Sequence, residues 1–437
     1  MPDIITTIYF ATIGASIHPL LYIVFDKKYQ CRPANAKSLY LVSSKFSGFA
    51  THPVSIIICI TLAILGVFAN NFCLLLPLLI ITWRLYIGDR FLSLARGQGA
   101  PGYFCFLNTL IVFIAMMPDS YSTFSILGFL IQFIKVIIVV EYGSIFLSAG
   151  LFKFADLSKG NGMGFALGML NPMWSKIYNW KSLINKNTSL INYLGPALQI
   201  IGGVLFLTGN PVLGRIGTLV ISMMFLSITP QTRLSWLCPA ISLGMITSYL
   251  SLIELSQHVW FPYLFPVLLM LRLIVMANLF REYFTKIEGY WLISSLSSIY
   301  RRSLGVIIWK VFTFDIVRYI CAKNVIVKDF SNIYQASSNT SVYDSIVLSS
   351  LLSSEKYLPA NLYMARVNVV LQAFELDVLN YIVISKAKTN EEDLDCNKFI
   401  DNINTYSVKS LDLKSLGKIS SSINQTAVFD FFSSYSS

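Results

Sequence analysis

The feature that most limits what this chain can fold into is a series of apolar runs, most of them long enough to cross a membrane as helices. The hydrocarbon layer of a bilayer is about 30 Å thick and takes about 20 helical residues to cross. The first run is Ile4 to Val24, and others follow at short intervals as far as residue 280. Of the 437 residues 55% are hydrophobic and only 13% are charged, which excludes a soluble globular domain. We therefore expect an integral membrane protein.

The spacing of the runs predicts an all-α, polytopic bundle of about nine spans, residues 1–325, followed by a small polar extramembrane region, residues 326–437. The stretch from Val54 to Trp83 is too long for one span and has Asn70 and Asn71 near its middle, so it indicates a helical hairpin. Beyond Arg281 we expect an interfacial amphipathic helix, with one further span as the alternative. The remaining expected spans are Ile4 to Val24, Tyr103 to Met117, Phe124 to Phe154, 190–208, 212–229, 234–253 and Tyr263 to Phe280.

The formal net charge of +11 reflects membrane topology rather than nucleic-acid binding, because the Lys and Arg residues lie between apolar runs. With nine spans, the basic loops after the first, third and fifth helices fall on one side, which the positive-inside rule makes cytoplasmic. The three histidines and seven cysteines are dispersed, with no Cys-x-x-Cys pair. We therefore expect no metal site and no disulfide framework.

Ionisable residues at membrane depth are costly and are therefore candidates for function. The run from Phe124 to Phe154 contains Lys135, Glu141 and, near its end, Lys153. Arg272 lies inside the ninth run and is a counter-ion candidate for Glu141. We expect Glu141 and Arg272, with Lys135, to form buried ion-pair interactions that shape a cavity.

Lys153 follows a notch of small residues, Ser148-Ala149-Gly150, that would let another helix approach closely. Removing an amine from water favours its neutral form, so a buried lysine can act as a base or a nucleophile. The alternative is that Lys153 extends towards the headgroups and only marks the membrane boundary. The sequence leaves both interpretations open.

The order of four motifs resembles the horizontally transferred transmembrane (HTTM) family, which includes the membrane region of vitamin K-dependent gamma-carboxylase and membrane proteins that mature the sporulation-delaying toxin. In chain order, the motifs are Gly66 to Asn71, Arg96 to Ala100, the Ala149-Gly150 pair with Lys153 and a following Pro172-x-Trp174, and Trp309 to Phe312. In the carboxylases, the corresponding lysine deprotonates vitamin K hydroquinone. The resemblance implies the same role for Lys153, and a quinone-like or lipid-like molecule as cofactor.

Two departures from the carboxylases bear on the activity. Their Asn-His pair before the fourth span is replaced here by Gly99-Ala100-Pro101-Gly102, and their large lumenal domain is replaced by about 110 residues. Family members are also thought to place the C-terminal region outside the cytoplasm, which conflicts with the charge rule. The sequence therefore leaves the orientation of the chain and its status as an enzyme open.

The preferred hypothesis is an HTTM-type protein of the bacterial plasma membrane, acting as a membrane enzyme or peptide-maturation factor with Lys153 as base or substrate anchor. Its partners would be the lipid bilayer and a peptide substrate or a partner membrane protein. The alternative is a non-catalytic scaffold or a subunit of a larger membrane complex. A transporter ranks third, because we find neither an inverted repeat nor paired broken helices.

Overall fold

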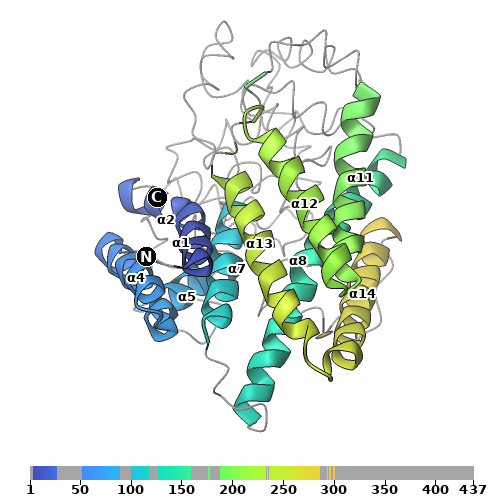
Figure 1. Cartoon of the computed structure of the whole chain (residues 1–437). Coiled ribbons are helices and arrows are strands. Elements are labelled where there is room, and N and C mark those ends of the chain that lie inside the picture. The colour runs from blue at the N-terminus through green and yellow to red at the C-terminus, as the bar shows by residue number, and fades with distance from the viewer. Residues whose placement is uncertain are drawn as a thin grey trace, which may run out of the picture.

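The computed structural model describes residues 3–26, 52–88, 100–117, 126–158, 176–177, 188–232, 234, 236–285, 293, 295–296 and 299–300. In this part of the chain the regular structure is entirely helical, and no strand occurs. The all-helical expectation is therefore confirmed for the described residues (Figure 1). The helices are α1 (Ile4–Ser16), α2 (His18–Phe25), α4 (Pro53–Phe68), α5 (Leu76–Trp83), α7 (Ala100–Ala115), α8 (Ile126–Ser158), α11 (Thr188–Leu207), α12 (Pro211–Ile228), α13 (Leu237–Ser256) and α14 (Phe261–Thr285).

Four helical segments of the described chain are long and apolar enough to cross a membrane: Gly128–Ala155, Pro211–Ile228, Leu237–Ser256 and Phe261–Asn278. The pair α1 and α2 adds a fifth if it is one span bent by 41°. Pro19 lies in the first turn of α2, where a residue without an N–H group interrupts the helical hydrogen bonds. The other apolar helices are α4, α5 with its flanking turns, α7 and the part of α11 from Asn192 to Leu207, and each has fewer than 18 residues. The number nine for the spans therefore stays a prediction.

The hairpin expected between Val54 and Trp83 is present. Helix α4 ends at Phe68, and the chain reverses through Asn70, whose φ of +50° is in the left-handed region that asparagine tolerates better than most residues. The side chain of Asn71 accepts a hydrogen bond from the Cys73 N–H at 3.1 Å. A 3-10 turn, Phe72–Leu75, then leads into α5, which continues as a π-helical turn, Arg84–Gly88.

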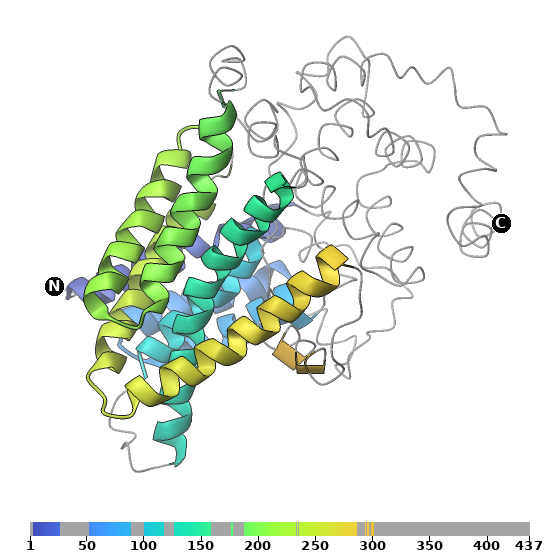
Figure 2. The same ribbon diagram turned by 90° about the vertical axis from the view of Figure 1, so that its right-hand side faces the viewer.

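Helix α13 lies in the centre of the bundle, with α1 and α7 on one side and α8 and α12 on the other (Figure 1). The helices α11 and α12 run side by side in both views, joined by a turn at Gly209, whose φ is +70° (Figure 2). Helix α8 contacts α11, α13 and α14, so all three ionisable residues expected in its run lie on a helix with neighbours on several sides. The site is built on this helix.

Candidate functional site

The seam between α8 and α11 is closed by glycines. A Cβ atom added to Gly150 would lie 2.7 Å from the Pro196 carbonyl oxygen and 2.6 Å from the side chain of Ile200. Further along the seam, a Cβ atom on Gly203 would lie 2.8 Å from the Leu147 backbone nitrogen. The two backbones can approach this closely only because these positions carry no side chain. The notch predicted around Gly150 is therefore confirmed, and its partner is α11.

Lys153 follows Gly150 by one helical turn, and its amine is buried in this seam. The side chain is 8% exposed, and the Nζ atom donates a hydrogen bond to the Oε1 atom of Gln199 at 2.9 Å. Gln199 is itself 6% exposed. In the described part of the chain this neutral amide oxygen is the partner of the amine.

The Lys153 side chain is directed into the bundle, which favours a buried amine over a boundary marker. A lysine that marks the membrane boundary would extend its amine beyond the end of the helix towards water. Instead Lys153 bonds to Gln199, the residue before Ile200, which packs against Gly150 one turn deeper in the span. A helical side chain directed towards the helix N-terminus, as most are, produces this arrangement.

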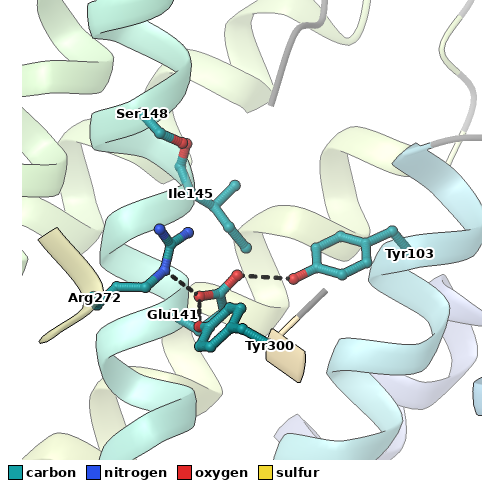
Figure 3. Close-up of polar contacts among 6 residues, drawn as sticks. All are labelled: Tyr103, Glu141, Ile145, Ser148, Arg272 and Tyr300. Carbon is teal, nitrogen blue, oxygen red and sulfur yellow. Dashed lines mark hydrogen bonds and ion pairs between the residues drawn. The ribbon is translucent and has the colours of Figure 1, made fainter. Parts of the chain in front are cut away.

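Glu141 lies near the middle of the same span and is fully buried. Figure 3 shows its carboxylate between the side chains of Arg272, Tyr103 and Tyr300. Its Oε2 atom accepts a hydrogen bond from Arg272 Nε at 2.8 Å, and its Oε1 atom accepts one from Tyr103 Oη at 3.1 Å. The hydroxyl of Tyr300 also donates to Oε2, and the Arg272 guanidinium carbon lies 5.2 Å from the centre of the Tyr300 ring. The structure thus brings Glu141 and Arg272 together, as the sequence suggested.

Lys135 belongs to a separate ion pair. Its Nζ atom lies 2.5 Å from the Oε1 atom of Glu254 in α13, and the lysine is 1% exposed whereas the glutamate is 33% exposed. Lys135 therefore takes part in an ion pair with Glu254 and not in the centre at Glu141, which lies six residues further along α8, about 9 Å along the helix axis.

The two carboxylates and the amine of Lys153 differ in what they can do chemically. Glu141 has one cationic and two hydroxyl donors, so its charge is compensated and its lone pairs are used. Glu254 neutralises Lys135. The amine of Lys153 has a neutral partner, so of these three groups it has the most capacity left to bind or react.

A polar layer around Asn108 was not foreseen. The Nδ2 atom of Asn108 donates to Ser16 Oγ at 2.7 Å and to the Ala240 carbonyl at 2.8 Å, and the hydroxyls of Thr12 and Thr247 lie 2.9 Å apart. These bonds join α1, α7 and α13 inside the bundle. We assign the layer to packing, because hydrogen bonds between membrane helices commonly have this role.

Four partners of the predicted residues were also missed by sequence reasoning. Tyr103, Glu254 and Tyr300 occur where tyrosines and acids are common, and no pattern in the sequence marks them. Gln199 carried a usable signal, because it lies in an otherwise apolar stretch from Ala197 to Leu207, where a polar side chain needs a partner.

Tyr300 also bears on the segment beyond Arg281, which we expected to be interfacial. Its hydroxyl contacts Glu141 in the middle of a span, so this residue reaches the interior of the bundle. The rest of that prediction, the motifs at Pro172 and Trp309 and the region 326–437 lie outside the described residues.

Among the described residues, no group of three or more His, Cys, Asp or Glu side chains could hold a metal ion. Comparison of the chain with protein-family models, with curated proteins and with solved structures finds no match.

Proposed function

We propose that this chain is a multi-pass membrane protein of the HTTM type that acts on a peptide or a lipid-soluble substrate, with Lys153 as the base or the substrate anchor. The observation that carries the proposal is the buried Lys153 amine, whose partner in the described chain is the neutral amide of Gln199. A buried lysine without a carboxylate partner is costly, and such groups are concentrated at functional sites. The resemblance of the surrounding motif to the carboxylases adds the expectation of a quinone-like or lipid-like cofactor.

The apolar helices support the membrane part of the proposal. Each of the nine expected spans contains a helix in the described chain, and four or five of these helical segments have the length and composition of a span. We propose that the shorter helices cross the membrane as well, which gives nine spans within residues 1–325 and leaves residues 326–437 outside the bilayer. The bacterial plasma membrane is the proposed location, by resemblance to the HTTM proteins.

A comparison of co-purified molecules tests this proposal. Wild-type protein, Lys153→Met and the matched control Lys176→Met, which alters an exposed lysine, would be purified in mild detergent and extracted for mass spectrometry. We expect an apolar molecule that accompanies the wild type and the control but not Lys153→Met. Identical extracts from all three proteins, with the variants folded, would contradict a functional role for Lys153.

A second candidate function is a non-catalytic scaffold, and the centre at Glu141 favours it. Three donors from α7, α14 and the segment at Tyr300 converge on one carboxylate, an arrangement that holds elements together and leaves little chemistry. Under this alternative the same purification would recover a protein partner, and Lys153→Met would leave that partner bound.

A further inference from the structure

Of the three charged side chains of α8 that the structure describes, Lys153 is the one whose hydrogen-bond partner carries no opposite charge. Lys135 meets the carboxylate of Glu254 at 2.5 Å, and the carboxylate of Glu141 meets Arg272 at 2.8 Å. The amide oxygen of Gln199 accepts one N–H of Lys153 but supplies no negative charge. An ammonium group has three donors, so two of them are not used by Gln199.

The residues that flank Lys153 in α8 are apolar and packed against neighbouring helices. Phe152 precedes Lys153 and is buried against Phe280, with their ring centres 5.9 Å apart. Phe154 follows and packs against Tyr193 of α11 at the same distance, and Tyr193 is 51% exposed. Leu151, two residues before Lys153, and Leu194, which follows Tyr193, are also exposed, so both helices of the seam present apolar side chains at the surface.

We propose that Lys153 remains charged and binds the anionic head group, a carboxylate or a phosphate, of an apolar molecule that lies along the seam between α8 and α11. The two remaining N–H groups match the two oxygens of such a head group, and charge-assisted bonds of this kind are stronger than bonds between neutral groups. The apolar chain would cover the exposed side chains of Leu151 and Leu194. This inference rests on the proposed function of Lys153 and selects the role of anchor over that of base.

The variant Lys153→Arg separates these two roles. An arginine keeps the positive charge and can still bind a carboxylate or a phosphate, but it cannot give up its proton to act as a base. Gln199→Glu provides the complementary test, because a carboxylate placed beside the ammonium would neutralise it and compete with the ligand.

The experiment measures binding to the full-length protein in detergent by native mass spectrometry, with oleate and oleyl alcohol as one pair of probes. Phosphatidic acid and diacylglycerol with the same acyl chains form the second pair. We expect wild-type protein to prefer the anionic member of at least one pair by about tenfold or more. The pair that shows the preference distinguishes a carboxylate from a phosphate ligand. Lys153→Arg and the control Lys176→Met should keep the preference, whereas Lys153→Met and Gln199→Glu should lose it.

Two results would overturn the inference. Equal binding of the charged and neutral probes by the wild type would show that no anion is recognised. A preference for the anionic probe that survives in Gln199→Glu, or is lost in Lys153→Arg, would show that the charge at position 153 does not hold the ligand. These two variants test the inference even if Lys153→Met fails to fold. If binding of both neutral probes falls in a folded Lys153→Met, the proposed function of Lys153 stands and only the anion is wrong.

Discussion

Replacing Arg272 with Met should destabilise the protein more than any other single change in its described ion pairs. The substitution keeps most of the apolar volume and removes the cation from a fully buried carboxylate. Glu141 would then keep the hydroxyls of Tyr103 and Tyr300 but no positive charge. A buried charge without a counter-ion is the costliest product of such a change.

The distance in the structure sets the magnitude. At the 2.8 Å between Arg272 Nε and Glu141 Oε2, two unit charges attract by about 6 kcal/mol at an effective dielectric constant of about 20. The variant regains the desolvation cost of the arginine, so we expect a net loss of about 3 to 5 kcal/mol in the free energy of unfolding. Tyr103→Phe removes one neutral donor and should cost about 1 kcal/mol.

Reversible unfolding of the purified protein in mixed micelles of mild detergent and sodium dodecyl sulfate measures these values. Lys135→Met is the matched control, because it also replaces a buried cation but leaves Glu254, which water can reach, and should cost about 1 kcal/mol. The double variant Glu141→Gln with Arg272→Met removes both charges and should be more stable than Arg272→Met alone. The reasoning is refuted if Arg272→Met costs no more than Lys135→Met, or if the double variant is the less stable.

Three further changes test other parts of the structure. Gly150→Ala should cost about 1 to 3 kcal/mol of stability, because the new methyl group would press on the α11 backbone. Gly195→Ala is the control, because a methyl group there meets open space and should be neutral or slightly stabilising. Equal losses of stability in the two variants would contradict the close seam. Of the four described cysteines, Cys73 alone is exposed and should react first with a membrane-impermeant maleimide in detergent. The variant for this test has serine at Cys31, Cys321 and Cys396, and labelling of the buried Cys59, Cys105 and Cys238 at the same rate would refute the packing. The backbone hydrogen bond from Thr6 lowers the pKa of the Asp3 carboxyl. The stabilisation of α1 by this cap is therefore present above the pKa that Asp3 has in the unfolded chain, and it is lost as the pH falls through the lower pKa of the folded protein. An NMR titration that gives an unshifted or raised pKa for Asp3 would contradict this.

Much of the fold could be predicted because apolar runs and helix breaks are local signals. The hairpin at Asn70 and the notch at Gly150 were both readable, since each depends on one or two residues whose conformation or size is unusual. The lengths of the helices were less readable. Helix α5 has only eight residues, with a 3-10 turn before it and a π-helical turn after it, although its stretch was expected to form two full spans.

The site was predictable in its residues but only in part in its pairings. Charges at membrane depth stand out in a sequence, and mutual attraction made Glu141 and Arg272 a natural pair. The partner of Lys135 was not predictable, because Glu254 lies near the end of α13, where an acid looks like an ordinary helix-end residue. The direction of the Lys153 side chain depends on how close α11 lies, and that distance is a property of the packed bundle.

The most direct test of the account is an experimental structure of the purified protein in a lipid bilayer, with the density around Lys153 as the measurement. We predict that the amine of Lys153 lies within hydrogen-bond distance of Gln199, deeper in the span than the Lys153 backbone. We also predict density for an apolar molecule whose head group reaches the amine. An amine directed outwards to the lipid headgroups, in a seam without a ligand, would contradict the central claim and leave the chain as a structural membrane protein.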